Sequence, residues 1–317
     1  MIRRMSIRLA FLSLLLVLFA STSEAQLQGI VDVHAHSDPD NQPRRLDGLE
    51  LAKEAKTEGM RGAVLKNHQM PTTQLAYMVN QLVPGFQTFG SLVLNRAVGG
   101  INPQVVEQQA TVKGKFFKVV FMPTVDAESP QARNANPPRP YVPIAKDGVL
   151  LPATVEVLKL MAKYDLVLAT GHLQPADSLL LIGEAHKMGI NRIVVTHAIN
   201  QGTTIPQMQE EAKNGAFLEF TGNPILPAGQ NGSLTIIPNA PSRKPEEWAA
   251  AIHAVGAEHC IISGDFGGTN FPPYIEGWKM YIAALKGAGV TDAEIDLMAR
   301  KNPAQMLGMD SATTSAK

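Results

Sequence analysis

Cysteine and excess charge are both scarce in this sequence, and each scarcity excludes a class of protein. The 317 residues include one cysteine, Cys260, so an internal disulfide is excluded, and its apolar surroundings favour a buried, unreactive thiol. Lysine and arginine together number 28, as do aspartate and glutamate, and no run of basic residues occurs. We therefore expect no basic face and no nucleic-acid binding, and a small neutral or anionic substrate fits better than a polymer.

Long hydrophobic runs are scarce too, and the one near the start indicates export. Arg3, Arg4 and Arg8 precede the almost wholly apolar segment Leu9–Ala20. After this segment, Ser23-Glu24-Ala25 offers small residues at the two positions where a signal peptidase needs them. The segment is too short to span a bilayer, and no cysteine follows it to carry a lipid. We expect residues 1–25 to be a signal peptide cleaved near Ala25, which predicts a periplasmic or secreted protein without a stable membrane anchor. The pair Arg3-Arg4 also permits twin-arginine export, although the following residues match that signal poorly.

The rest of the chain has the composition of an ordinary globular domain. Hydrophobic residues make up 45% of the sequence and charged residues 18%. The length fits either one large α/β barrel or two smaller domains. We predict a single domain over residues 26–311 and a flexible tail over residues 312–317.

Apolar runs of β-type composition recur along the chain at the spacing of repeated βα units. Several are continuous rather than alternating, as expected of strands buried on both faces, so the sheet is predicted to be parallel and covered by helices. The runs are Gly29–His34, Gly62–Lys66, Thr88–Leu94, Phe116–Met122, Leu166–Thr170, Arg192–Thr196, Ala216–Phe220 and Cys260–Ser263.

Segments of helical periodicity lie between these runs. In one of them, Asn102-Pro103 offers a capping residue followed by proline at the first helical position. The other helices are predicted over Leu46–Thr57, Thr154–Lys163, Ala176–Lys187, Pro206–Lys213, Pro245–Ala254, Tyr274–Lys286 and Asp292–Met306. Eight strands with intervening helices predict a (β/α)8 TIM barrel. A doubly wound open sheet is the alternative, but no glycine-rich nucleotide loop follows any strand.

Two connections are longer than the others. Asp126–Leu151 follows the fourth strand and is rich in Pro, Asn and Arg, and Thr221–Lys244 follows the seventh and is rich in Pro, Gly and Asn. Both connections therefore lie at the carboxyl ends of strands, where barrel active sites are built. We expect lids or binding loops that decide substrate specificity, with a plain surface insertion as the alternative.

Polar side chains collect where the predicted strands end. His34 and His36 are two residues apart in an extended segment, so both are expected on one face, and paired imidazoles suit zinc and similar divalent ions. The alternative is a pair of surface histidines in a turn. Further polar residues follow four other strands and are expected at the same mouth. They are Lys66, Asn67 and His68, then His172, His197 and Asp265.

This order of ligands resembles the metal centre of the amidohydrolase superfamily. The run 302–308 is similar to the closing helix of many members, and residues 64–68, 169–172 and 258–261 resemble a poorly characterised amidohydrolase-like branch with no known substrate. The resemblance implies that His34 and His36 bind one metal and that His172 and His197 complete or share a second. It also implies that Asp265 binds metal and acts as the base. In such a site a cation lowers the pKa of bound water, and a carboxylate takes its proton.

One departure from the family pattern concerns the bridging ligand. Two-metal members usually supply a carboxylated lysine or a glutamate from the fourth strand, and here that strand ends in Phe121-Met122-Pro123-Thr124 without a carboxylate. Lys66 is the better placed residue, because a neutral amine in a dry mouth can add carbon dioxide or contact substrate. A charged Lys66 that pairs with Asp265 or with substrate is the alternative. The sequence leaves open whether the site binds one metal ion or two.

Other polar residues are candidates for contact with substrate. Arg45 is suited to clamp a carboxylate, although a salt bridge to Asp47 or Asp40 is the alternative. Asn95 either bonds to substrate or caps the turn, and His68 is a third candidate. Glu219 suits the orientation of a metal-bound histidine.

Together these features predict a metal-dependent hydrolase of a small amide, lactone, cyclic imide or related ester. We expect zinc, with manganese or iron as the other candidate ions, a small-molecule substrate, and a chain that is compatible with a homo-oligomer. A metal-dependent decarboxylase or lyase of the same superfamily is one alternative. An exported barrel that binds metal or metabolite without catalysis is the other.

Overall fold

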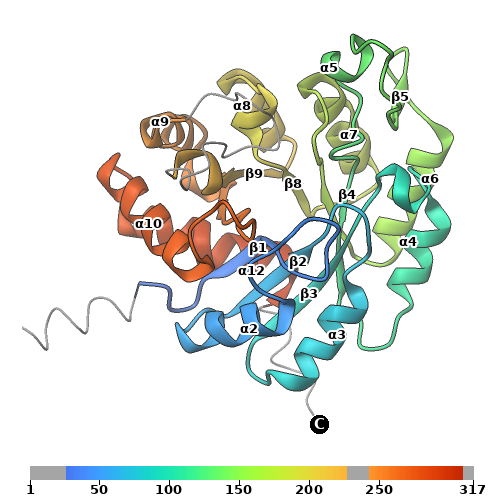
Figure 1. Ribbon diagram of the computed structural model, residues 1–317. Coiled ribbons are helices and arrows are strands. Elements are labelled where there is room, and N and C mark those ends of the chain that lie inside the picture. Colours follow the sequence, from blue (N-terminus) through green and yellow to red (C-terminus); the bar gives the residue numbers. More distant parts are fainter. Residues whose placement is uncertain (1–25, 227–242, 310–317) are drawn as a thin grey trace, which may run out of the picture.

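The computed structural model describes residues 26–226 and 243–309, and its central element is one sheet of eight parallel strands (Figure 1). The strand order, β1-β2-β3-β4-β7-β8-β9-β10, follows the chain. These strands are β1 (Val31–His36), β2 (Gly62–Lys66), β3 (Gln87–Val93), β4 (Phe117–Phe121), β7 (Val167–Ala169), β8 (Ile193–Val195), β9 (Ala216–Thr221) and β10 (Cys260–Ser263). Helices lie between successive strands and cover the outside of the sheet, so the predicted (β/α)8 barrel is confirmed.

The helices follow the predicted pattern, with two additions, α3 and the short α5. They are α2 (Gly48–Thr57), α3 (Thr73–Leu82), α4 (Pro103–Ala110), α5 (Pro130–Arg133), α6 (Pro152–Lys163), α7 (Pro175–Lys187), α8 (Ile205–Lys213), α9 (Pro245–Val255), α10 (Tyr274–Gly287), α11 (Asp292–Asp296) and α12 (Asn302–Leu307). Helix α3 was not predicted. In the structure the hydroxyl of the preceding Thr72 does not cap it and donates instead to Leu65 O at 2.7 Å. Asn102 does cap α4, as predicted.

The last predicted helix, Asp292–Met306, is interrupted. A π-helical turn, Leu297–Lys301, separates α11 from α12. Pro303 explains the interruption, because its nitrogen has no hydrogen to donate and its ring would clash with the carbonyl group four residues earlier in a continuous α-helix. Helix α12 ends at Gly308, which has a left-handed φ of 72° that glycine tolerates.

The barrel closes at the mouth rather than along the full length of β1 and β10. The His36 N–H donates to Phe266 O at 2.9 Å, and the Asp265 N–H donates to His34 O at 2.8 Å. The closing hydrogen bonds are thus made by residues just beyond the end of β10. Closure of the sheet and placement of the polar cluster therefore depend on the same short stretch of backbone.

Both long connections follow the strands predicted for them. The first, after β4, contains α5 and a small antiparallel hairpin of β5 (Ala145–Lys146) and β6 (Val149–Leu150). The second, after β9, begins with a 3-10 turn, Asn223–Ile225. Residues 227–242 of this connection, the predicted signal peptide (1–25) and the predicted tail (312–317) lie outside the described residues.

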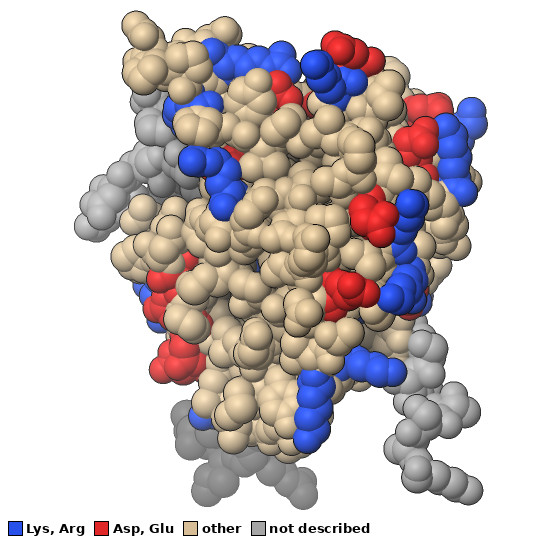
Figure 2. Space-filling model, turned by 90° about the vertical axis from the view of Figure 1, so that its right-hand side faces the viewer, with Lys and Arg blue, Asp and Glu red and all other residues tan. Residues whose placement is uncertain are grey.

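Charged side chains of both signs are interspersed on the face that Figure 2 shows. Two of the ion pairs on the helices are Lys163–Glu107, at 3.0 Å, and Lys159–Glu156, at 3.3 Å. Their side chains are 47–62% exposed, so each pair contributes little to stability. The stability of the barrel therefore comes mainly from its buried layers, which include Trp248 and Trp278, and the thiol of Cys260 is buried as expected.

One carboxyl group, that of Glu211 on α8, is buried away from any basic partner. Its Oε1 accepts a hydrogen bond from Ser178 Oγ of α7 at 2.6 Å, and no residue that the structure describes bonds to its Oε2. Burial raises the pKa of Glu211 to about 7. The folded protein therefore holds a proton that the unfolded chain loses near the ordinary pKa of 4.5, so stability falls as the pH rises from 4.5 through 7.

Replacing Glu211 with Gln should remove this loss of stability. The amide oxygen of glutamine accepts the Ser178 hydrogen bond and has no proton to lose. Urea unfolding at pH 5 and pH 8 should therefore show that the variant gains, relative to the unmutated protein, on the order of 2–3 kcal/mol as the pH rises. Glu210→Gln on the exposed face of α8 is the control. Parallel pH dependence in all three proteins would contradict the explanation.

Candidate metal centre

Five imidazoles surround the carboxyl-terminal mouth of the barrel in a closed ring of contacts. Neighbouring ring centroids are separated by 5.3 Å for His34–His36, 5.1 Å for His36–His68, 6.0 Å for His68–His172, 4.8 Å for His172–His197 and 5.7 Å for His197–His34. They come from β1 and from the segments that follow β2, β7 and β8. The structure thus brings together histidines that are up to 163 residues apart in the sequence.

His34 lies at the centre of the polar contacts. Its Nδ1 lies 3.0 Å from Glu219 Oε1, and its Nε2 lies 3.1 Å from Asp265 Oδ1 and 2.8 Å from Lys66 Nζ. Burial opposes protonation of His34, but Asp265 and Glu219 raise its pKa to about 9, so without an ion the imidazole is protonated. Because an ionised carboxylate only accepts hydrogen bonds, Glu219 keeps the proton on Nδ1. A metal ion would displace the proton of Nε2, and the lone pair of Nε2 would then be available for ligation.

Glu219 holds several groups of the site at once. Its Oε1 also accepts a hydrogen bond from Ser263 Oγ at 2.7 Å, and its Oε2 accepts one from the His197 N–H at 3.0 Å. Burial by itself would raise the pKa of Glu219, but the charge and hydrogen bond of His34 lower it to about 2. The carboxylate is therefore ionised, and it can orient His34 as the sequence suggested.

Asp265 brings a carboxylate oxygen between the first two histidines. Its Oδ1 lies 3.1 Å from His34 Nε2 and 3.2 Å from His36 Nε2, while its Oδ2 accepts a hydrogen bond from Asn223 Nδ2 at 2.8 Å. Burial opposes ionisation, but the charges and hydrogen bonds of His34 and His36 hold the pKa of Asp265 well below its usual range. Asp265 also has a left-handed φ of 51°, which is costly for a residue other than glycine and is maintained by the closing hydrogen bond to His34.

The donor set of His34, His36 and Asp265 fits a divalent metal ion. Their ligand atoms lie within 4.8 Å of one another, and two imidazole nitrogens with one carboxylate oxygen are a common set for catalytic zinc. His36 Nδ1 is buried without a hydrogen-bond partner. Burial is the main cause that lowers the pKa of His36 to about 3, so the ring is neutral and its Nε2 is able to bind a cation.

Lys66 is buried beside this donor set. Its Nζ lies 2.8 Å from His34 Nε2 and 4.6 Å from the centroid of the Phe121 ring. Burial lowers the pKa of Lys66 to about 8, against the opposing effects of Asp265 and Glu219. Its hydrogen bond goes to His34 rather than to Asp265, which the sequence had offered as the partner of a charged lysine.

His172 and His197 lie beside each other on the far side of the ring from His36. Their side chains are outside the group of three whose ligand atoms converge, as far as the described chain shows. Gln201 Nε2 lies 3.1 Å from His197 Nδ1, and an amide nitrogen only donates, so the proton of neutral His197 belongs on Nε2. Burial lowers the pKa of both imidazoles, that of His197 to about 4. The second metal site predicted for this pair stays a prediction.

The three candidates for substrate contact have different surroundings. His68 faces the mouth, where its Nδ1 lies 2.8 Å from Thr124 Oγ1. Asn95 is buried, donates to Thr124 Oγ1 at 2.8 Å and accepts from the Thr124 N–H at 2.8 Å, so its amide holds the turn after β3, which was the alternative for this residue. Arg45 is exposed and donates to the carbonyl oxygens of Thr269 and Phe271 at 2.7 Å and 2.8 Å. These carbonyl groups, rather than Asp40 or Asp47, are its partners.

Three residues that position the candidate metal-binding side chains were not predicted from the sequence. Asp32, Gln201 and Asn223 each bond to a group of the metal centre or its backbone. Asp32 lies in the same strand as His34 and His36 and was within reach of the sequence pattern. Gln201 and Asn223 lie in turns after β8 and β9, where spacing alone gives no direction for a side chain.

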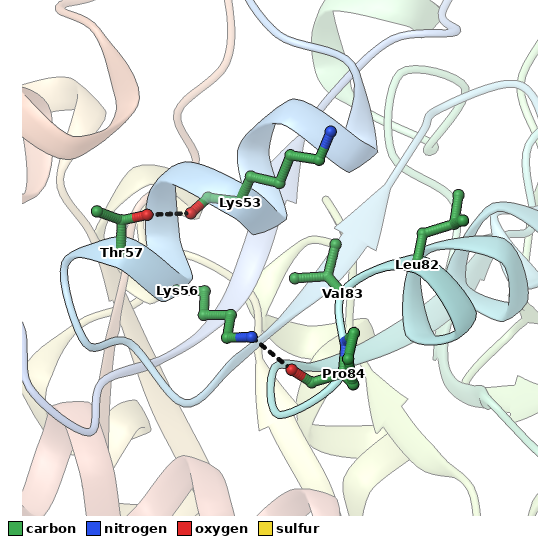
Figure 3. Close-up of a pocket in the computed structure, with 6 residues that line it drawn as sticks. All are labelled: Lys53, Lys56, Thr57, Leu82, Val83 and Pro84. Atoms are coloured by element: carbon green, nitrogen blue, oxygen red, sulfur yellow. Dashed lines mark hydrogen bonds between the residues drawn. The ribbon is translucent and has the colours of Figure 1, made fainter.

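A pocket away from the mouth carries no such chemistry. Figure 3 shows it between the carboxyl-terminal ends of α2 and α3, where the Lys56 ammonium donates to Pro84 O at 2.6 Å. Its lining consists of Lys53, Lys56, Thr57, Leu82, Val83 and Pro84. With no histidine, cysteine or carboxylate in that lining, the candidate site is the mouth.

Comparison with known families assigns the chain to a family whose function is unknown. Residues 29–219, more than half of the chain, match the family described as "Family of unknown function (DUF6282)". The chain belongs to this family. No curated protein sequence matches it significantly.

Solved structures agree with this chain in fold at low sequence identity. The probable dipeptidase PvdM from Pseudomonas aeruginosa is 14% identical, with a TM-score of 0.61 over 92% of this chain and 97% of that one. An amidohydrolase from Pseudomonas aeruginosa is 13% identical, with a TM-score of 0.59 over 90% and 98%. The 2,6-dihydroxybenzoate decarboxylase from Rhizobium is 14% identical, with a TM-score of 0.56 over 89% and 99%. The resemblance to the amidohydrolase superfamily is therefore confirmed in the fold.

Metal analysis of the purified protein tests the donor set. After zinc loading and dialysis, the unmutated protein should retain zinc, and His34→Ala should lose it because one of three ligands is missing. Glu219→Gln should weaken zinc binding about 10–100-fold, because the carboxylate no longer fixes the proton on Nδ1. His253→Ala, at an exposed histidine on α9, is the control. Equal zinc content in all four proteins would refute the site, and one or two ions per chain would decide between a single and a double centre.

Proposed function

We propose that this chain is a metal-dependent hydrolase of a small amide, lactone, cyclic imide or related ester. The observation that carries the proposal is the convergence of His34 Nε2, His36 Nε2 and Asp265 Oδ1 at the mouth of the barrel. These three residues would hold the ion, zinc by preference, with manganese or iron as the other candidates. A divalent ion there supplies Lewis acidity, which polarises a substrate oxygen and lowers the pKa of bound water.

Asp265 supplies the base in this proposal. Its low pKa keeps it ionised at neutral pH, so Oδ1 is able to accept a proton from the attacking water. Asn223 holds Oδ2 at 2.8 Å and thereby fixes the plane of the carboxylate. The same oxygen that accepts the proton is then in place to deliver it to the leaving group.

His197 and Lys66 supply the remaining polar groups. With its Nδ1 facing the Gln201 amide, His197 presents an Nε2 proton, which suits stabilisation of the oxygen that gains negative charge. Lys66, whose pKa burial lowers to about 8, has a neutral fraction at neutral pH and is able to contact substrate or add carbon dioxide. In a two-metal centre these two residues would instead be ligands of the second ion together with His172, and His197 would then have to carry its proton on Nδ1 rather than on Nε2.

A decarboxylase is the second candidate, because 2,6-dihydroxybenzoate decarboxylase from Rhizobium shares the fold. In that reaction Asp265 would hold a proton and deliver it to the product carbon. The low pKa of Asp265 favours the hydrolase, because a carboxyl group that is ionised at neutral pH is suited to take a proton rather than to hold one.

Hydrolysis of dihydrocoumarin and of p-nitrophenyl acetate by zinc-loaded protein tests the proposed function. We expect Asp265→Asn to reduce kcat/KM about 10²–10⁴-fold, because the amide cannot act as a base. Chelation should reduce the unmutated protein similarly, and His253→Ala is again the control. Undiminished hydrolysis after chelation would overturn the proposal, and release of carbon dioxide from a carboxylate substrate without hydrolysis would favour the decarboxylase.

We also propose that the chain is exported and that residues 1–25 are removed, on the strength of the apolar run and the small residues before Gln26. Among the described residues, no helix is long and apolar enough to cross a membrane. Mass spectrometry of the full-length product, expressed in a Gram-negative host and recovered from the periplasm, should give an amino terminus near Gln26. An intact Met1 in the cytoplasmic fraction alone would contradict export.

A further inference from the structure

Arg44 occupies a defined place beside the mouth. It lies in the connection between β1 and α2, where its backbone forms an antiparallel bridge with Gly268. The next residue, Arg45, donates its N–H to Gly267 O at 3.0 Å, and the same segment bonds to β1 through Phe266. In Figure 1 the connection after β1 accordingly runs beside the segment after β10. The backbone of Arg44 is therefore fixed next to the strand ends that carry His36 and Asp265.

The side chain of Arg44 is buried, whereas that of Arg45 is exposed and bonded to loop carbonyl groups. The side chain of Arg44 is only 7% exposed. After burial, the charge of Arg44 is a further cause that lowers the pKa of His36 and of Lys66. The guanidinium group therefore lies within electrostatic reach of both residues.

Most hydrogen-bond donors of Arg44 are unused. Its Nε donates to Asp40 Oδ2 at 2.7 Å, and Nη2 lies 2.5 Å from the same oxygen in an ion pair without hydrogen-bond geometry. Within the described chain, six buried side-chain atoms have no hydrogen-bond partner, and two of them, Arg44 Nη2 and His36 Nδ1, are at the mouth. His36 Nδ1 would carry a proton if Nε2 bound a metal ion, so in the metal-bound form it would join Arg44 Nη2 as a buried donor that lacks a hydrogen-bond acceptor.

We propose that Arg44, together with His36, binds a carboxylate group of the substrate. Two unsatisfied buried donors call for an acceptor with negative charge, and the planar guanidinium matches the two oxygens of a carboxylate. Asp40 contacts the guanidinium through one oxygen only and leaves its other edge free. The inference rests on the proposed function, because it narrows the substrates of the same mouth to small amides, lactones or imides that bear a carboxylate.

Benzoate and benzamide, which have similar shape and differ in charge, are suitable probes of this site. Isothermal titration of the unmutated protein, at constant ionic strength, should show that benzoate binds more tightly than benzamide. We expect this preference both in the zinc-loaded and in the metal-free protein. Arg44→Gln should weaken benzoate binding about 10–100-fold in both forms, as expected for the loss of a charge-assisted bond. Arg44→Lys should also weaken it, because an ammonium group cannot form two parallel bonds. Lys159→Gln, which removes an exposed positive charge on α6, is the control and should bind like the unmutated protein.

Variants of Asp40 guard against a simple folding defect. Asp40→Asn keeps the acceptor for the Asn41 N–H, which lies 2.6 Å from Asp40 Oδ1, but frees the guanidinium from its ion pair, so benzoate should bind more tightly. The double variant Asp40→Asn with Arg44→Gln leaves no buried unpaired charge and should fold but bind benzoate weakly. Equal benzoate affinity with and without Arg44, no preference over benzamide, or no benzoate binding by the unmutated protein would overturn the proposal.

The metal-free titrations separate this inference from the proposed function. If zinc-loaded protein hydrolyses no ester while Arg44→Gln still weakens benzoate binding to metal-free protein, the carboxylate site stands and the hydrolase does not. If benzoate binds only in the presence of zinc and independently of Arg44, the ion alone holds the anion and the carboxylate site is refuted.

Discussion

The carboxylate of Asp32 is the interaction on which the geometry of the mouth depends. Its Oδ1 accepts hydrogen bonds from the backbone of His34 at 2.9 Å and of Gly264 at 3.1 Å, and its Oδ2 accepts bonds from Tyr274 Oη at 2.8 Å and Trp278 Nε1 at 3.1 Å. Burial raises the pKa of Asp32, and the hydrogen bonds to its carboxylate oppose that rise. One side chain thus joins β1, the end of β10 and helix α10. It places His34 and Asp265 within reach of one point.

Burial decides the charges of the groups around that point. It disfavours the charged form of every ionisable side chain, and for His36, His68, His172 and His197 it dominates, so these imidazoles are neutral. The carboxylates of Glu219 and Asp265 resist it, because His34 lies against both of them. Neutral imidazoles beside ionised carboxylates are what a divalent cation needs. The charges of the mouth are therefore consistent with a metal centre and with an anionic group held by Arg44.

Much of this arrangement was predictable from the sequence. The eight apolar runs correspond to the eight strands, and the bounds of β2 and β10 agree fully with the prediction. The order of His34, His36, His172, His197 and Asp265 also indicated a common mouth, because carboxyl ends of parallel strands meet at one side of a barrel. Helix α3 and the π-helical turn were missed. The π-helical turn had a local signal, Pro303, which hydrophobic periodicity does not take into account, whereas the bond of the Thr72 hydroxyl to Leu65 O depends on a partner in another segment.

By itself, then, the sequence determined the barrel, its long loops and which residues gather at the mouth, since strand period and chain order are local properties. Only the tertiary structure decided how those side chains point. A register shift between Asp32 and Ala35 in β1 directs His34 to the mouth and leaves Asp32 facing α10, although simple alternation puts both on one face. The partners of His197, Asp265 and Arg44 come from other segments of the chain. Hydrogen bonds across the closing seam of the barrel fix these directions, and no spacing within one segment encodes them.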